Sequence, residues 1–208
     1  AWHTGTKDCV RLTTRTGKRV ELTLEHRLWG FDGWKPISEI EIGERVAVPR
    51  RTRPRATADR CDAEVKLVAY MIAEGGTTAR YRGTVRLITC HNSFTNADPV
   101  IVSDFQHCCS ELGFGVHQVR HGSRSDASRR AWITYQVKGC QQWLRDNNLS
   151  GKGAHEKRVP QWVFQLPERQ RWLFLAAMID TDGWVTDRDG VAIALANEPL
   201  INDLVYLF

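Results

Sequence analysis

Two stretches of the sequence are alike and decide the fold of most of the chain: LVAYMIAEG at residues 67–75 and LAAMIDTDG at residues 175–183. Each is an apolar run with helical spacing that ends in a carboxylate followed by glycine, a residue that commonly terminates helices. A carboxylate in the last turn opposes the helix dipole, at a cost of about 0.3 to 1 kcal/mol. Because this unfavourable arrangement occurs twice, we expect a cation to compensate it at Glu74 and Asp182.

Small side chains favour close packing of the two predicted helices, which would bring Glu74 and Asp182 together at one end. The small residues are Ala69, Ala73, Ala176 and Ala177. Mg²⁺, or Mn²⁺ in its place, is a hard cation that one or two carboxylates can hold while positions stay open for water and phosphate oxygens. The sequence therefore predicts a divalent-metal site here, and the alternative is two core helices with acidic ends.

The first 48 residues predict short strands. Val10–Thr14 and Arg19–Thr23 are rich in β-forming residues, and Thr16-Gly17 between them is a hairpin turn signal. The stretch Pro49–Arg55 then holds two prolines and four arginines, which exclude a helix and favour an extended connector. We place a domain boundary at this connector and expect one domain at residues 1–55 and another at residues 56–208.

After the connector, the hydrophobic period predicts the order αββαββα. The expected elements are a helix ending at 74, a hairpin of 77–81 and 84–90, a helix at 98–112, a strand pair of 116–121 and 131–137, and a helix at 139–147. A further apolar helix at 169–179 starts a second unit, which is too short to be completed. Together with the all-β first part, this order predicts the α+β class.

The composition of the sequence argues against a membrane-spanning or secreted protein. The chain has 208 residues, 42% of them hydrophobic, yet no apolar run reaches the roughly 18 residues that a membrane helix needs. The first ten residues carry charge where a signal peptide would have an apolar core. Its six cysteines form no CxxC pair, so we interpret them as buried thiols in a reducing cytoplasm.

The distribution of charge suggests a nucleic-acid partner. The net charge is +5, and the stretch Arg120–Arg158 holds nine basic residues against three acidic ones, whereas Phe174–Phe208 holds one against six. The basic and acidic zones are therefore separated along the chain, and a basic zone can attract a polyanion such as a nucleic acid. The alternative is a set of solvated faces that happen to be unevenly charged.

The paired motifs, separated by one αββαββα unit, resemble those of the LAGLIDADG (DOD-type) homing endonucleases found inside inteins, over roughly residues 64–208. The resemblance implies a monomer in which the motif helices join two pseudo-symmetric halves. It also implies that the last acid of each motif, Glu74 and Asp182, binds the metal ions that drive hydrolysis of phosphodiester bonds. The first motif departs from the pattern at Ile72, where an acid is common, and in having Glu at position 74; the second keeps Asp180.

A second block supports the same resemblance. Lys-Arg-Val-Pro at residues 157–160 is similar to the family's Lys-x-Ile-Pro block, whose lysine lies near the scissile phosphate. The resemblance makes Lys157 the third catalytic residue, polarising the attacking water or stabilising developing charge. The alternative is a solvated loop lysine.

In this family, double-stranded DNA lies against the exposed faces of the strand pairs, where Arg and Gln contact base edges and basic side chains hold phosphates. Alternation along the strands exposes Thr84, Arg86, Gln118, Arg120, Trp132, Thr134, Gln136 and Lys138, although Trp132 could belong to the core. Arg124, Arg129 and Arg130 fall on the predicted loop between two strands, where they would contact the DNA backbone.

The first part of the chain resembles the splicing (Hint) domain of inteins. Thr23-Leu24-Glu25-His26 is similar to the family's Thr-x-x-His block, and the resemblance continues at Gly33-Trp34 and at residues 42–49, with bacterial replicative DNA helicase inteins the most similar. It implies that Thr23 and His26 assist the first acyl shift, with His26 donating a proton to the leaving nitrogen. The partner would then be a host protein as extein.

Two parts that splicing requires are missing, because no Cys or Ser begins the chain and no His-Asn pair ends it. We therefore expect a fragment with a partial Hint domain and a truncated second endonuclease half, or one piece of a split intein. The leading hypothesis is an intein-encoded, site-specific, metal-dependent DNA endonuclease. The competing hypotheses are a catalytically inactive DNA-binding remnant and a cysteine-type autoprocessing protein without nuclease activity, although the latter leaves the repeated motif unexplained.

Overall fold

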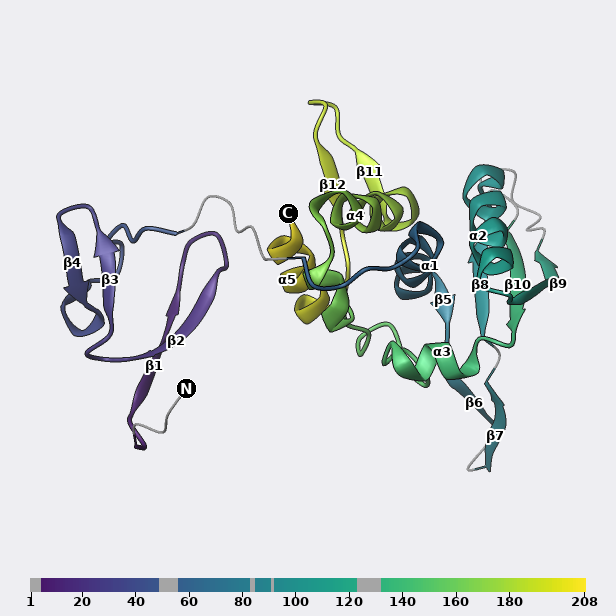
Figure 1. The fold of residues 1–208 in the computed structure, drawn as a ribbon, viewed down its shortest axis with the longest axis horizontal. Coiled ribbons are helices and arrows are strands. Elements are labelled where there is room, and N and C mark those ends of the chain that lie inside the picture. The colour runs from purple at the N-terminus through teal and green to yellow at the C-terminus, as the bar shows by residue number, and fades with distance from the viewer. Residues whose placement is uncertain (1–4, 49–55, 83–84, 91, 123–131) are drawn as a thin grey trace. The chain divides into compact units, whose positions relative to one another are not determined.

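A computed structural model describes the chain except residues 1–4, 49–55, 83–84, 91 and 123–131. The chain divides into two compact units, residues 1–53 and 54–208, which are described separately (Figure 1). The connector predicted at Pro49–Arg55 lies outside the described residues.

The first unit is built from two antiparallel hairpins. Strands β1 (Cys9–Thr13) and β2 (Arg19–Thr23) pair across the predicted turn, where Gly17 has a φ of 83°. Strands β3 (Arg27–Gly30) and β4 (Gly33–Pro36) form the second hairpin, followed by the short 3-10 helix η1 (Ile37–Glu39). Ile37 is the only apolar side chain of this unit that is buried among its described residues.

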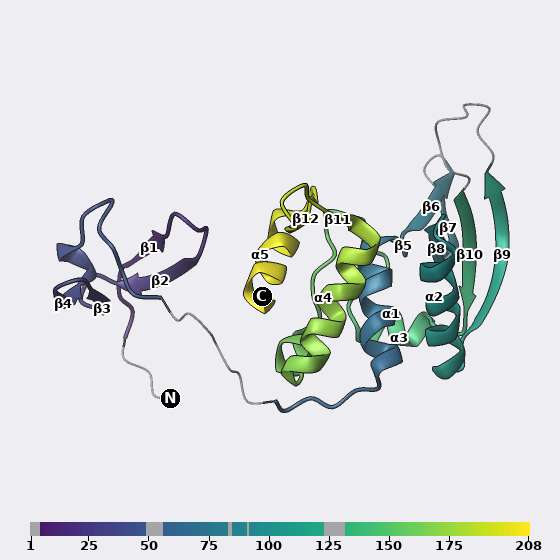
Figure 2. The same cartoon turned by 90° about the horizontal axis from the view of Figure 1, so that it is seen from above.

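The second unit has a four-stranded sheet in the order β5-β8-β10-β9. Its strands are β5 (Gly75–Gly76), β8 (Ser93–Asn96), β10 (Trp132–Lys138) and β9 (Gly115–Gly122). A separate hairpin is formed by β6 (Ala79–Arg82) and β7 (Val85–Cys90). Helix α2 (Pro99–Glu111) packs on the sheet through Phe105, whose ring stacks on Phe94 at 4.0 Å, and α3 (Gln141–Asp146) follows β10 (Figure 2).

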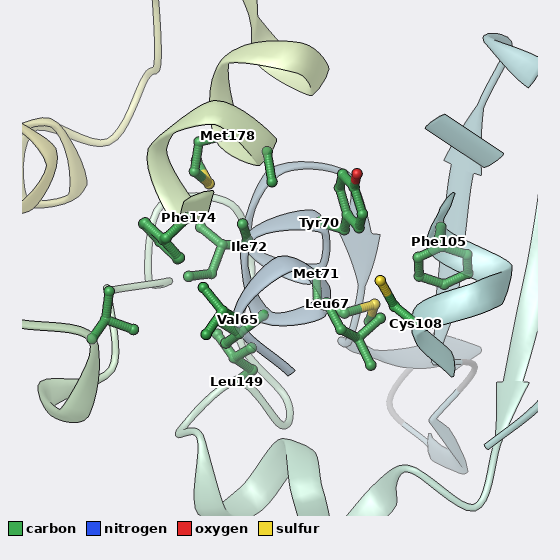
Figure 3. Packing of buried hydrophobic residues seen from close by; sticks show 14 of the residues in the cluster. Val65, Leu67, Tyr70, Met71, Ile72, Phe105, Cys108, Leu149, Phe174 and Met178 are labelled. Atoms are coloured by element: carbon green, nitrogen blue, oxygen red, sulfur yellow. The ribbon is translucent and has the colours of Figure 1, made fainter. Parts of the chain in front are cut away.

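Helix α1 (Asp62–Ala73) runs through the centre of the core. On one side, it meets Phe105 and Cys108 of α2, and on the other Phe174 and Met178 of α4 (Glu168–Asp182) (Figure 3). It is tied to α2 by the Tyr70 hydroxyl, which donates to Asp104 at 2.6 Å. The predicted packing of the two motif helices is therefore confirmed, with Ala69 and Ala177 buried, although Ala176 is exposed.

The chain after α4 repeats the arrangement that follows α1. The 3-10 helix η2 (Gln161–Gln165) precedes α4, and β11 (Gly183–Val185), β12 (Val191–Ile193) and α5 (Glu198–Leu207) follow it. The first glycine after each motif helix pairs with a later strand, since Gly75 lies opposite Phe94 and Gly183 lies opposite Ile193. Both later helices begin at a capping side chain, Asp98 for α2 and Asn197 for α5.

The α+β class is confirmed, and the predicted positions of α1, α2, α3 and α4 agree with the structure to within a few residues. The sequence analysis missed β5, β8, β11, β12 and α5. Its interpretation of the cysteines as buried is wrong for Cys9 and Cys61, which are exposed, and correct for Cys108, Cys109 and Cys140, while the side chain of Cys90 lies outside the description. Among the described residues, no helix is long and apolar enough to cross a membrane.

Candidate active site

The two motif helices end in the same way, because a glycine is sterically required directly after each carboxylate. A Cβ added to Gly75 would lie 2.4 Å from the Met71 carbonyl oxygen, and one added to Gly183 would lie 2.7 Å from that of Ile179. Such contacts fall far inside van der Waals distance, and backbone atoms cannot move aside cheaply. The chain therefore passes close to the last helical turn at both glycines, with Glu74 as the C-cap residue of α1 and Asp182 as the last residue of α4.

Both carboxylates have raised pKa values, and Asp182 contributes to the rise at Glu74. Burial raises the pKa of Glu74 to about 7, a hydrogen bond from Asn96 acts against this rise, and the nearby charge of Asp182 adds to it. Burial also raises the pKa of Asp182, and the ammonium of Lys157 counteracts that effect. Raised pKa values indicate that the negative charges lack sufficient compensation, which a bound cation would supply.

Asn96 is part of this site, and the sequence analysis missed it. Its side-chain amide, on the last residue of β8, donates to Glu74 Oε2 at 2.7 Å, while its Oδ1 accepts from the backbone N–H of Asp98 at 2.7 Å. The residue is 9% exposed, so both bonds are shielded from water. Its position follows from the pairing of Gly75 with Phe94, two residues earlier, but β8 itself had escaped prediction.

Lys157 lies near enough to Asp182 for their charges to interact, and it is 3% exposed. Its ammonium donates to three backbone carbonyls, those of Met71 at 2.8 Å, Ile72 at 2.9 Å and Gly75 at 2.6 Å. Burial lowers its pKa to about 8, and the charge of Asp182 opposes this change. The alternative of a solvated loop lysine is therefore wrong, because this side chain is buried against the C-terminal end of α1.

The two carboxylates form a small donor set that fits a hard divalent cation. Glu74 and Asp182 provide two carboxylates, and no group of three or more His, Cys, Asp or Glu ligands occurs within the described part of the chain. Mg²⁺ is commonly bound by one or two carboxylates, with waters and substrate phosphates completing its octahedron. Two carboxylates at one end of two packed helices satisfy that requirement.

The sheet presents a polar face made by β8, β10 and β9. Thr134 and Gln136 are half-buried and Lys138 is exposed, and all three alternate with the buried Tyr135 and Val137. Thr134 faces Thr95 of β8, with 2.9 Å between their hydroxyl oxygens. The predicted alternation on β10 is therefore present, and it separates a polar face from a core face.

A β-bulge in β9 changes the prediction for the neighbouring strand. The register moves between Thr134 and Tyr135, so that Thr134 pairs with Arg120 but Tyr135 pairs with Gln118. Gln118 is exposed, yet its partner belongs to the core face, and His117 is the residue opposite Gln136. Gln118 is exposed as strict alternation predicted, but its strand partner and that of Arg120 lie on different faces, because the bulge adds a residue between them.

Several predicted DNA-contacting residues are described only by their backbone or lie outside the described residues. Arg124, Arg129 and Arg130, with Thr84, lie outside the described residues. For Arg86, Arg120 and Trp132, the backbone belongs to β7, β9 and β10, respectively, and their side chains lie outside the description.

In the first unit, Thr23 and His26 are brought together by a turn. The backbone N–H of His26 donates to the Thr23 carbonyl at 3.0 Å, which closes the connection between β2 and β3. The His26 carbonyl accepts from the backbone N–H of Ile37 at 2.9 Å, and the residue as a whole is exposed. The imidazole is therefore available to a group that approaches this turn.

No protein-family model matches the chain. It is similar to the replicative DNA helicase DnaB of Synechocystis, at 26% identity over 208 residues that cover 97% of this chain and 23% of the helicase. It is also similar to the protein RecA of Mycobacterium tuberculosis, at 28% identity over 186 residues that cover 88% of this chain and 22% of RecA. The chain thus spans about a fifth of the length of these curated relatives.

Among solved structures, the chain is similar to that of I-DmoI in complex with DNA and Mn. The TM-score is 0.45 at 14% sequence identity, and the match covers 70% of this chain and 75% of I-DmoI. This level of similarity is too low to assign a common fold.

Proposed function

We propose that residues 56–208 belong to a metal-dependent, site-specific DNA endonuclease of the LAGLIDADG type, carried within an intein. The observation that supports this most is the pairing of α1 and α4. Two similar helices pack together, each is followed or ended by a carboxylate directly before a sterically required glycine, and the charge of Asp182 adds to the raised pKa of Glu74. A structural role alone would not favour two under-compensated acids at one end of a buried helix pair.

In this proposal, Glu74 and Asp182 hold Mg²⁺ or Mn²⁺, and the ion would polarise a phosphate oxygen and lower the pKa of a bound water. Asn96 orients the Glu74 carboxylate by donating to its Oε2. Lys157 contributes positive charge beside Asp182, where negative charge develops during phosphodiester hydrolysis. Because the Lys157 ammonium and the Asn96 amide are buried, water competes little for either group.

Duplex DNA would lie along the polar sheet face. Thr134, Gln136 and Lys138 are proposed contacts, together with Gln118 and the arginines Arg86, Arg120, Arg124, Arg129 and Arg130. Amide and guanidinium groups can contact base edges, and basic groups neutralise phosphates. His117 joins this set, since it pairs with Gln136.

The proposal of an intein is supported by the partial coverage of two differently named relatives. One chain resembles about a fifth of a replicative helicase and also about a fifth of RecA, two proteins with different names. A shared insert explains two partial matches better than a shared overall function does. Residues 1–55 would then be part of the Hint domain, with Thr23 and His26 at the splicing site and the host protein as extein.

The nuclease proposal is tested by Asp182→Asn in the protein expressed with its flanking coding sequence. Cutting of duplex DNA should require Mg²⁺ or Mn²⁺ and should fall at least about a hundredfold, the loss typical of one missing transition-state contact. DNA affinity should stay nearly unchanged, because Asn keeps the shape of the side chain. Asp187→Asn makes the same charge change at an exposed residue and serves as the control.

Cutting by Asp182→Asn at the wild-type rate, or cutting in the presence of a chelator, would refute the assignment of this site. Salt-dependent DNA binding without cutting by the wild type would instead favour the alternative of an inactive DNA-binding remnant. These outcomes are distinguishable in one set of binding and cleavage assays.

The splicing proposal is tested by His26→Ala in the same protein. Loss of the proton donor should abolish cleavage at the N-terminal junction, and the exposed position of His26 predicts an unchanged unfolding midpoint. Normal junction cleavage by this variant would assign His26 a structural role only.

A further inference from the structure

All three N–H donors of the Lys157 ammonium bond to backbone carbonyls. An ammonium has three N–H donors and no acceptor, and here three carbonyl oxygens lie within 2.9 Å of Nζ. No N–H is left to donate to a water or a phosphate oxygen in this arrangement. A role for Lys157 as a direct proton donor would therefore first require breaking one of these bonds.

The three carbonyls lie on both sides of Glu74. Met71 and Ile72 belong to the last turn of α1, whose carbonyls have no partner within the helix, and Gly75 begins β5. The Lys157 ammonium is thus bonded to the chain on both sides of Glu74, at Ile72 two residues before it and at Gly75 directly after it. At the end of α4, the hydroxyl of Thr181 instead bonds back to Ala177 and Met178, whereas α1 has Ala73 at the matching position and no such hydroxyl.

The backbone of Lys157 is itself held by a buried side chain. Asn197, which is 4% exposed, donates from Nδ2 to the carbonyls of Lys157 at 2.8 Å and Ala154 at 2.9 Å. Its Oδ1 accepts from the backbone N–H of Leu200 at 3.1 Å and caps α5. The Lys157 side chain therefore projects from a backbone anchored to the start of α5.

We infer that Lys157 is a positioning residue, which places Glu74 by closing the C-terminal end of α1, and that Asn197 is a second positioning residue acting through Lys157. The activity part of this inference rests on the proposed nuclease function. The structural part does not, because it concerns hydrogen bonds within the protein.

The first experiment is nuclear magnetic resonance on the wild-type protein with ¹⁵N-labelled lysine and ¹³C-labelled carbonyls. Lys157 should give a slowly exchanging ammonium signal, with scalar couplings across hydrogen bonds to the carbonyl carbons of Met71, Ile72 and Gly75. A rapidly exchanging Lys157 ammonium without these couplings would overturn the inference. This measurement needs no variant to fold and no nuclease activity.

The second experiment compares Lys157→Met and Asn197→Ala with the control Lys152→Met, a half-buried lysine on the same loop. Lys157→Met should lower kcat on the order of a hundredfold, as a displacement of about 1 Å can. The Mg²⁺ concentration for half-maximal cutting should rise about tenfold, and the Kd for DNA should stay unchanged. Asn197→Ala should reproduce the metal effect in weaker form, and the control should match the wild type.

The Mg²⁺ requirement separates positioning from proton transfer. Loss of a proton donor alone would lower kcat and leave the Mg²⁺ concentration for half-maximal cutting unchanged, whereas displacement of Glu74, a proposed metal ligand, raises it. A wild-type Mg²⁺ requirement in Lys157→Met or in Asn197→Ala would overturn the inference. Absence of cutting by the wild type would refute the proposed nuclease function instead, and the magnetic resonance result would still decide the role of Lys157.

Discussion

Glu74 and Asp182 occupy matching positions in the two motifs but have different surroundings. Glu74 accepts a hydrogen bond from Asn96, whereas the residue two positions after Ile193, the strand partner of Gly183, is Leu195. The charge of Lys157 opposes the rise that burial causes in the pKa of Asp182, and its ammonium bonds to the backbone on either side of Glu74. The two carboxylates are therefore not equivalent, although their motifs look alike in the sequence.

The raised pKa of Glu74 predicts how stability varies with pH in the metal-free protein. Glu74 titrates near 7 in the folded state, and near its ordinary value of 4.5 when unfolded. Between these values, the folded state binds more protons than the unfolded state, so the free energy of unfolding should fall as pH rises from about 4.5 to about 7. Asp182, whose pKa is also raised, acts in the same direction.

Urea denaturation at pH 5 and pH 7 measures this fall, and Glu74→Gln should reduce it because the amide does not titrate. An equal fall in wild type and variant would show that Glu74 is not the group responsible. Addition of Mg²⁺ should also oppose the fall at pH 7, since a cation favours the charged carboxylate.

From the sequence, Glu74, Asp182 and Lys157 could be proposed as site residues, but their interactions could not be described. Two like motifs predicted the pairing of their helices, because apolar helices with small residues can pack closely. The partners of Lys157 are backbone carbonyls, and backbone groups leave no trace in side-chain patterns. Asn96 was missed for a related reason, since its role depends on a strand of four residues, Ser93–Asn96, that carries little hydrophobic signal.

At the scale of elements, the glycine that ends each motif helix has a steric role that can be measured. Gly75→Ala should lower the free energy of unfolding by about 3 kcal/mol, because its Cβ would lie 2.4 Å from a carbonyl oxygen and 2.7 Å from a Cα of the same helix. Gly183→Ala should behave similarly, with its nearest contact at 2.7 Å.

Gly115→Ala is the matched control, because its added Cβ would meet Lys138 at an ordinary 3.6 Å. Its effect on urea denaturation should stay within about 0.5 kcal/mol. Equal stabilities for Gly75→Ala and Gly115→Ala would mean that the helix end can relax and that glycine is not required there.

Helices were predicted more accurately than strands. Helices α1 and α2 have apolar faces that repeat over twelve or more residues, and α4 contains a continuous apolar run at residues 172–179, so all three are evident without a structure. Strands β5 and β8 have two and four residues, and a bulge interrupts β9. A bulge adds one residue to an alternating pattern, and nothing in a single sequence marks where the count changes.

At the scale of the whole molecule, the two units differ in how much apolar surface they bury. The hydrophobic core cluster draws all its members from the second unit. In the first unit, large apolar side chains are exposed, with Phe31 at 88% and Trp34 at 61%. Burial of apolar area is the main favourable contribution to folding, so the free energy that opposes local opening should differ between the units.

Hydrogen exchange of the intact chain should therefore show two levels of protection. Amides of α1, α4 and β10 should exchange slowest, at the rate of global unfolding, and amides of β1 to β4 should exchange at least about a hundredfold faster. Equal protection in both units would show that the first unit is stabilised by more than its own described residues bury.

The bond from Lys157 to Gly75 joins groups 82 residues apart in the chain, which has a consequence for the timing of synthesis. At about 5 to 20 residues per second, Lys157 leaves the ribosome roughly 4 to 16 s after Gly75. During that interval, the carbonyls at the C-terminal end of α1 lack the Lys157 ammonium, and Glu74 is not fixed in place. A nascent or prematurely released chain would thus carry the first motif without an ordered site, so the DNA cutting that we propose would arise only after most of the domain had been translated.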